Sequence, residues 1–242
     1  MSDAMLSVEN LSAWYGAARI LYDLNFNVGR GEVVALMGRN GAGKSTAMKT
    51  IMGLVAQRHG AVRFNGDDIS GLKPFEIARH GLGFTPEDRR IFADLTVMEN
   101  LDIGRQPPRR FPDGAVAPTW TPSRLFTLFP NLAEMPDRLG GRMSGGEQQM
   151  LTVARTLMGN PLLVLLDEPS EGVAPLIVEQ MAATIVELKK EGLSILLSEQ
   201  NIHFARLVSD RVYVLEKGQI QWHGSMAQLD NNPDVQRAYL TV

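Results

Sequence analysis

The sequence predicts an α/β fold with a mostly parallel core sheet, an antiparallel β layer and a helical subdomain. In the last third of the chain, short buried-strand patterns alternate with helical patterns, which is typical of a parallel sheet covered by helices. These strand patterns lie at 162–166, 193–197 and 212–215. Near the N-terminus, apolar residues alternate with polar ones at 6–8 and 24–28, as in half-buried antiparallel strands. A largely helical stretch separates the two regions.

This helical stretch interrupts the chain without dividing it into separate domains. The 242 residues are enough for one α/β domain with a substantial core. We expect a single domain over 1–242, in which 1–95 and 159–242 form the core and 96–158 form the helical subdomain. Residues 105–122 are rich in Pro and Arg and have no clear period. They are predicted to be an irregular, solvated surface connection in preference to a partner contact.

Composition and charge exclude several classes of function. The formal net charge is −3, so no overall positive field favours nucleic acid. The chain has no cysteine, which excludes disulfides, thiolate metal sites and cysteine nucleophiles. Residues 1–10 lack the basic start and long apolar stretch of a secretory signal, and the apolar run at 162–166 is far too short to span a bilayer. Any membrane role is therefore expected to be peripheral.

The stretch 33–46, VVALMGRNGAGKST, joins an apolar strand, a glycine-rich turn and a helix start. Its spacing of Gly38, four residues and then Gly43-Lys44-Ser45 is that of the phosphate-binding P-loop. Its glycines are expected to take left-handed backbone angles and to bring N–H groups close to phosphate oxygens. Lys44 is predicted to reach the β- and γ-phosphates, and the Ser45 hydroxyl to bind Mg²⁺. The nucleotide-binding residues expected here are Gly38, Asn40, Gly41, Ala42, Gly43, Lys44, Ser45 and Thr46.

A second motif follows the apolar run at 162–166, which ends in Asp167 and Glu168. This is a Walker B pattern, in which carboxylates stand at the carboxyl end of a buried strand. Because parallel strands end at one edge of a sheet, Asp167 is predicted to lie beside the Ser45 hydroxyl and to hold Mg²⁺ through water. Glu168 is predicted to polarise a water molecule for attack on the γ-phosphate. A nucleoside triphosphate with Mg²⁺ is the expected ligand.

A third motif, Ser144-Gly145-Gly146-Glu147, allows two interpretations. Ser144 and Glu147 form a capping-box pattern in front of a helix with a regular apolar face. A Ser-Gly-Gly helix start also presents backbone N–H donors to an anion. The two roles are compatible, so the capping interpretation does not exclude the binding one.

In this order the three motifs resemble the nucleotide-binding domain of ATP-binding cassette (ABC) transporters, over essentially the whole chain. Residues 143–147, MSGGE, are similar to the Leu-Ser-Gly-Gly-Gln signature of that family. The resemblance implies a head-to-tail dimer in which each ATP lies between two subunits. One subunit would hold it on the P-loop, and the other would cover it with Ser144, Gly145 and Gly146. The resemblance also implies that Tyr15 stacks on the adenine.

Three positions depart from the general cassette pattern and resemble the ATPases of branched-chain (hydrophobic) amino-acid importers, the LivF-like type. Glu87 replaces a loop glutamine, Gln200 replaces the switch histidine, and Glu147 ends the signature. Gln200 can donate a hydrogen bond to the γ-phosphate but cannot shuttle a proton. We therefore expect it only to position the γ-phosphate. An ionised Glu87 only accepts, which favours a place near Mg²⁺ or its waters. The expected catalytic residues are Glu168, Lys44 and Gln200, and the expected metal-side residues are Ser45, Asp167 and Glu87.

The resemblance implies the ATPase subunit of an importer for branched-chain or hydrophobic amino acids, or for similar small solutes such as urea, amides and aromatic acids. It implies transmembrane permease subunits, a second cassette (identical or a sister subunit) and, indirectly, an extracytoplasmic solute-binding protein, with no nucleic acid. The chain would lie at the cytoplasmic face of the inner (plasma) membrane. The alternatives are an export or lipid-handling ATPase of the lipopolysaccharide-transport type, an ABC protein acting on DNA or ribosomes, and a regulatory subunit without turnover. The first generally keeps a switch histidine, which Gln200 argues against.

Overall fold

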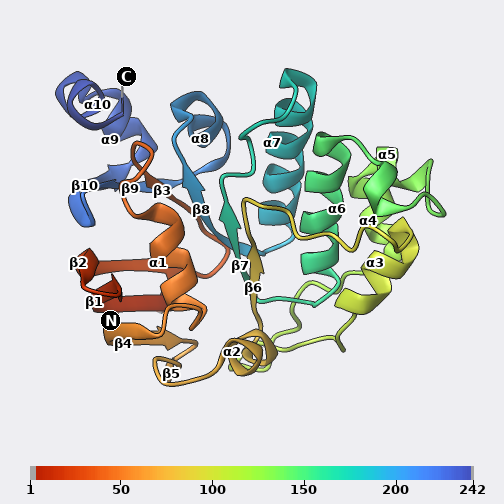
Figure 1. The fold of residues 1–242 in the computed structure, drawn as a ribbon, viewed down its shortest axis with the longest axis horizontal. Coiled ribbons are helices and arrows are strands. Elements are labelled where there is room, and N and C mark those ends of the chain that lie inside the picture. The colour runs from red at the N-terminus through yellow and green to blue at the C-terminus, as the bar shows by residue number, and fades with distance from the viewer. Residues whose placement is uncertain (1–3, 241–242) are drawn as a thin grey trace.

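The computed structural model describes residues 4–240 and contains two β-sheets with helices around them (Figure 1). The larger sheet has the order β10-β9-β3-β8-β7-β6, and all its strands run parallel except β10. The predicted parallel core sheet is therefore confirmed. Its strands are β3 (Val33–Met37), β6 (Leu82–Thr85), β7 (Leu163–Asp167), β8 (Ser194–Glu199), β9 (Arg211–Glu216) and β10 (Gln219–Ser225).

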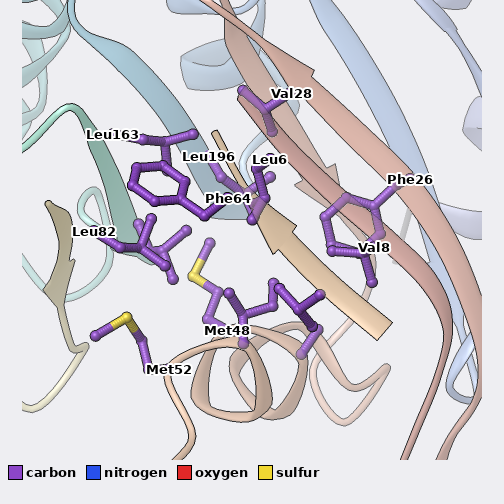
Figure 2. Close-up of a cluster of buried hydrophobic side chains, with 14 of the residues drawn as sticks. Leu6, Val8, Phe26, Val28, Met48, Met52, Phe64, Leu82, Leu163 and Leu196 are labelled. Atoms are coloured by element: carbon purple, nitrogen blue, oxygen red, sulfur yellow. The ribbon is translucent and has the colours of Figure 1, made fainter. Parts of the chain in front are cut away.

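The smaller sheet is the predicted antiparallel layer, with the order β2-β1-β4-β5. Its strands are β1 (Ala4–Tyr15), β2 (Ala18–Gly29), β4 (Gln57–Phe64) and β5 (Asp67–Asp68). Helix α1 (Lys44–Ile51) packs between the two sheets. Figure 2 shows Leu6 and Phe26 of the antiparallel layer, Met48 of α1 and Leu196 of the core sheet in one buried cluster. This packing holds the helix that follows the P-loop in a fixed place.

Helices cover the other face of the core sheet. In β8, Ile195 and Leu197 face a cluster with α6 (Gly145–Leu157), α7 (Pro175–Lys190) and α8 (Ile202–Val208), whereas Leu196 faces the α1 side. Burial on both faces explains why these strands are continuous apolar runs in the sequence. Two short C-terminal helices, α9 (Met226–Asp230) and α10 (Pro233–Tyr239), were not predicted, because such short segments have no measurable period.

The predicted helical stretch lies between β6 and β7, which are neighbours in the core sheet. Helix α2 (Pro74–His80) comes before β6. The stretch contains α3 (Val97–Gly104), α4 (Pro122–Leu128), α5 (Pro130–Ala133), a 3₁₀ turn (Gly140–Arg142) and α6. The Thr96 hydroxyl caps α3 by accepting a hydrogen bond from the N–H of Glu99 (3.2 Å). We propose that 96–158 is the helical subdomain and that 1–95 and 159–242 are the core, because the stretch leaves and rejoins the sheet at adjacent strands.

The stretch 105–122 has no helix or strand before Pro122, in agreement with the prediction of an irregular segment. Most of the segment is exposed, as expected of a solvated surface connection, but the prediction does not hold at its buried aromatic residues. Phe111 and Trp120 are almost fully buried, and each packs in a different hydrophobic cluster. The Arg30 guanidinium lies 3.5 Å from the centre of the Phe111 ring and pairs with Asp113. Single buried aromatic residues produce no periodic pattern, so they could not be recognised in a segment rich in Pro and Arg.

Candidate functional site

Three parallel strands, β3, β7 and β8, end at one edge of the core sheet, and most of the predicted site residues lie at or just after these strand ends. Ligands of open α/β sheets bind at this edge. A cavity of about 470 Å³ opens there. It is lined by Tyr15, Ile20, Asn40, Gly41, Gly43, Lys44, Ser45, Thr46, Glu87, Glu168 and Glu171. The structure thus brings most of the predicted nucleotide-binding residues to one cavity.

The glycines of the turn have different roles. Gly41 and Gly43 have φ values of 79° and 108°, the left-handed backbone that the sequence predicts. Gly38 does not have a positive φ, so that prediction is wrong for this position. A Cβ at Gly38 would lie 2.2 Å from the carbonyl oxygen of Leu215, at the end of β9. Gly38 is therefore required for close packing of the loop on β9. Ala42, whose carbonyl accepts a hydrogen bond from Gly218, also lies outside the cavity lining.

Lys44 is buried, and its ammonium group contacts two backbone carbonyls and a carboxylate. Its ammonium Nζ donates to the carbonyl oxygens of Gly38 (2.9 Å) and Arg39 (3.3 Å). It also lies 3.0 Å from Oε1 of Glu168, and the two side chains are 3% and 5% exposed. The sequence predicted both residues at the site but not this ion pair. In this state the Lys44 ammonium and the Glu168 carboxylate neutralise each other.

The position of Glu168 depends on an unusual backbone conformation. Its φ is 47°, in the left-handed region that a residue with a long side chain rarely adopts. Its backbone N–H donates to the carbonyl and the hydroxyl of Ser198, at 3.1 Å each. Burial raises the pKa of the Glu168 carboxyl, and the neighbouring Glu171 raises it further, whereas Lys44 lowers it. Such a conformation at a cavity is typical of functional sites.

Asp167 and Ser45 lie side by side, as predicted. The Ser45 hydroxyl donates to Oδ1 of Asp167 (2.9 Å), and the Ser198 hydroxyl donates to the same oxygen (2.6 Å). Burial raises the pKa of Asp167, and these two hydrogen bonds lower it in part. The other carboxylate oxygen, Oδ2, is buried and has no hydrogen-bond partner among residues 4–240. A buried, unpartnered acceptor next to a hydroxyl suits a hard cation.

The Ser144-Gly145-Gly146 segment lies elsewhere. Ser144 caps α6: its hydroxyl accepts from the N–H of Glu147 (3.3 Å), and its own N–H donates to the Glu147 carboxylate (2.7 Å). The predicted capping box is therefore confirmed. Helix α6 packs on α3 and β6 (Figure 1), and its first residues do not line the cavity of the P-loop. Within one chain the two predicted anion sites are separate.

Two residues of the cavity were not predicted, Ile20 and Glu171. Ile20 lies in β2 between Arg19 and Leu21, where no sequence pattern marks it as a site residue. Glu171 lies three residues after Glu168 in the same loop, and this spacing is the signal that could have found it. Gln200, which follows β8, donates a hydrogen bond from Nε2 to Oε2 of Glu171 (3.3 Å). Gln200 thus reaches the edge of the cavity through Glu171.

Comparisons with known proteins agree with this geometry. A family model described as ABC transporter matches residues 21–171. The chain is 43% identical over 236 residues to the high-affinity branched-chain amino acid transport ATP-binding protein BraG of Pseudomonas aeruginosa, covering 98% of this chain and 99% of that protein. It is 35% identical over 245 residues to the lipopolysaccharide export system ATP-binding protein LptB of Haemophilus influenzae, covering 98% and 97%.

The fold agrees as well. The ADP conformation of MJ1267, an ATP-binding cassette of an ABC transporter, matches with a TM-score of 0.79 at 28% identity, covering 97% of this chain and 96% of that one. Within residues 4–240, no helix has the length and the apolar character needed to cross a membrane. The match over residues 21–171, the two relatives and the cavity around Lys44 lead to one conclusion. The chain belongs to the ABC transporter family, as an ATP-binding cassette that hydrolyses ATP.

Proposed function

We propose that this chain is the ATPase subunit of an importer for branched-chain or hydrophobic amino acids, or for similar small solutes such as urea, amides and aromatic acids. One observation carries the proposal: Lys44, Ser45 and Glu168 line one cavity on a chain that is 43% identical to BraG. The test is reconstitution in liposomes with the permeases that co-purify. ATP-dependent uptake of leucine, or of another solute in this class, is the expected result. Transport only of a lipid or an exported solute would contradict the proposal.

The geometry supports a mechanism in which nucleotide binding releases Glu168. Lys44 now pairs with Glu168, and phosphate oxygens in the cavity would offer the ammonium a new partner. Glu168, freed from this pair, would accept a proton from the attacking water. Gln200 would donate a hydrogen bond to the γ-phosphate without taking a proton. Tyr15, which is half exposed at the rim of the cavity, would stack on the adenine.

The residues around Asp167 fit a magnesium ion. No group of three or more His, Asp or Glu side chains within 4–240 is arranged to hold a metal, so phosphate oxygens and waters would complete the coordination. The Ser45 hydroxyl would bind the ion directly, Asp167 would hold it through water, and Glu87 would face it or its waters. When bound, Mg²⁺ supplies positive charge that offsets the charge of the phosphates.

The role of Glu87 gives a test of this arrangement. Glu87→Gln should raise the Mg²⁺ concentration that half-saturates ATP hydrolysis by roughly tenfold, since loss of a group that holds metal-bound water typically weakens binding by about 10- to 100-fold. The measurement is a Mg²⁺ titration of phosphate release at fixed ATP. Glu134→Gln, at an exposed position away from the cavity, is the matched control. An unchanged Mg²⁺ dependence in Glu87→Gln would show that Glu87 does not act on the metal side.

ABC cassettes act as dimers with transmembrane permease partners. For this chain we propose a head-to-tail pair, with an identical or a sister cassette, in which Ser144, Gly145 and Gly146 of one subunit cover the ATP on the P-loop of the other. These residues do not line the cavity of their own chain, which supports the pairing because a second subunit would be needed to bring them to the P-loop. An extracytoplasmic solute-binding protein would act indirectly through the permeases. The chain would lie peripherally at the cytoplasmic face of the inner (plasma) membrane, with no role for nucleic acid.

A groove between the core and the helical stretch supports contact with a permease. It has a volume of about 600 Å³ and runs beside β6, α2, α3 and α6. Phe75, Phe92 and Ile103 line the groove, and each side chain is about half exposed. A group of exposed large apolar side chains at one place is typical of an interaction site. Arg79 lies over the Phe75 ring and Arg155 over the Phe92 ring. An apolar permease segment with acidic flanks would fit this surface.

Replacement of Phe92 tests this contact. Phe92→Asp removes an apolar ring from the groove and should reduce co-purification with the permeases by about tenfold, because apolar contact area is lost and the new carboxylate repels the acidic flanks proposed for the partner. Pull-down from solubilised membranes measures this, and ATP binding by the variant checks its fold. Leu207→Asp, at an exposed position on α8, is the matched control. Equal recovery of the permeases with Phe92→Asp and the control would contradict docking in this groove.

The main alternative is an export ATPase of the lipopolysaccharide type. The 35% identity to LptB supports this alternative. The two functions differ in the partner chains and in the solute that stimulates hydrolysis. Stimulation of the purified complex by an amino acid with its binding protein supports import. Stimulation by lipopolysaccharide alone would favour the rival.

A further inference from the structure

Gln200 is held by a partner outside the three sequence motifs. Its side-chain amide nitrogen Nε2 lies 3.3 Å from Oε2 of Glu171 and donates a hydrogen bond to it. Gln200 follows β8 directly, whereas Glu171 belongs to the loop that follows β7. The bond therefore joins two loops at the edge of the core sheet where the cavity opens.

Glu171 is itself fixed by the turn that carries Glu168. Its backbone N–H donates to the carbonyl oxygen of Glu168 (3.1 Å), which closes a tight turn. Its side chain lines the cavity together with Lys44 and Glu168. Its carboxylate accepts from Gln200 and lies close enough to the Glu168 carboxyl to raise the pKa of that group. It therefore lies between the residue predicted to activate water and the residue predicted to contact the γ-phosphate.

The chemistry of a glutamine explains why such a partner matters. A glutamine side chain has several rotatable bonds and loses rotamer freedom when it is held in one place, whereas an imidazole ring is more rigid. A carboxylate that accepts one N–H of the amide fixes its direction and leaves the second N–H for a phosphate oxygen. At this position a glutamine therefore needs a second group to orient it.

We propose that Glu171 is a positioning residue for ATP hydrolysis, which holds the Gln200 amide at the γ-phosphate end of the cavity. The inference rests on the proposed ATPase function and assigns a role to a carboxylate outside the P-loop, the Walker B pair and the signature. Glu171 acts through Gln200 and on the hydrolysis step, so its removal changes the rate of turnover more than the affinity for ATP.

The test is a double-mutant cycle on ATP hydrolysis by the purified chain. Glu171→Ala should lower kcat roughly tenfold, as expected for loss of one hydrogen bond to a charged group, with KM within about twofold of the wild type. Gln200→Ala should lower kcat by at least as much. The double variant should be no slower than Gln200→Ala alone, because the hydrogen bond through which Glu171 orients the amide is already lost in Gln200→Ala. The direct effect of Glu171 on the pKa of Glu168 is measured separately, as a shift of the pH profile of kcat. Glu171→Gln retains an acceptor oxygen and should restore most of the loss.

Each other outcome overturns the inference. Multiplied losses in the double variant would show that Glu171 acts independently of Gln200, and a raised KM at unchanged kcat would place it in nucleotide binding. An unchanged kcat in Glu171→Ala would show that Glu171 does not position Gln200 for hydrolysis. Glu179→Ala, an exposed carboxylate on α7, is the control for surface charge, and thermal unfolding checks the fold of every variant. A wild-type chain that cannot hydrolyse ATP would contradict the proposed function itself, which separates that failure from failure of the inference.

Discussion

Replacement of Glu168 by Gln is expected to reduce ATP hydrolysis by roughly 10²–10⁴-fold, the contribution of a general base, while ATP still binds. The amide has nearly the shape of the carboxylate but cannot take a proton from water. Lys44 keeps its hydrogen bond to the carbonyl of Gly38, so the P-loop should keep its form. Since ATP then persists between two cassettes, the variant should accumulate as a dimer. Phosphate release and size-exclusion chromatography with saturating ATP measure the two effects.

The control for this variant is Glu179→Gln, which makes the same chemical change on the exposed face of α7. It should hydrolyse ATP and elute as the wild type does. Monomeric elution of Glu168→Gln with saturating ATP would count strongly against the sandwich dimer. Hydrolysis near the wild-type rate would instead show that another group activates the water. The proposal that Glu168 is released from Lys44 to act as the base would then be wrong.

Replacement of Lys44 by Ala is expected to lower the rate of hydrolysis by about 10²–10³-fold, as for removal of one preorganised group that stabilises charge in the transition state. Lys44 lines the cavity and two carbonyl oxygens hold its ammonium there, so phosphate binding has to exchange only its pair with Glu168. The same change leaves Glu168 buried without its cation, which should lower the unfolding temperature.

These two effects of Lys44→Ala can be separated. The double variant Lys44→Ala with Glu168→Gln removes both charges and should recover most of the lost unfolding temperature, but none of the activity. Lys190→Ala, which removes an exposed ion pair with Glu187, serves as the control and should change neither quantity much. If Lys44→Ala kept wild-type kinetics, the nucleotide would not bind at this loop as proposed.

Much of the fold follows from local patterns in the sequence. The strands that are buried on both faces are continuous apolar runs, and the half-buried strands alternate, so their type and approximate position were predicted correctly. The capping box of Ser144 and Glu147 was also predicted correctly, because both partners lie within one helical turn. Motifs of this kind depend on residues that are close in the chain.

The P-loop and Walker B residues were predicted together for a different reason. Parallel strands end at the same edge of a sheet, so Ser45 and Asp167 could be expected to meet although more than a hundred residues separate them. The observed hydrogen bond of 2.9 Å between their side chains agrees with this expectation. The direction of the strands was therefore enough to predict that two residues far apart in the chain lie close together in the fold.

The fold class, the nucleotide loop and the carboxylates at the sheet edge could be predicted from the sequence, because each depends on a short pattern or on strand direction. The contacts between loops became visible only in the folded chain. Folding placed Gly38 against Leu215, buried Phe111, paired Lys44 with Glu168 and joined Glu171 to Gln200. Each of these contacts joins side chains or backbone from different loops, whose relative positions depend on packing of the whole domain and leave no period or spacing in the chain.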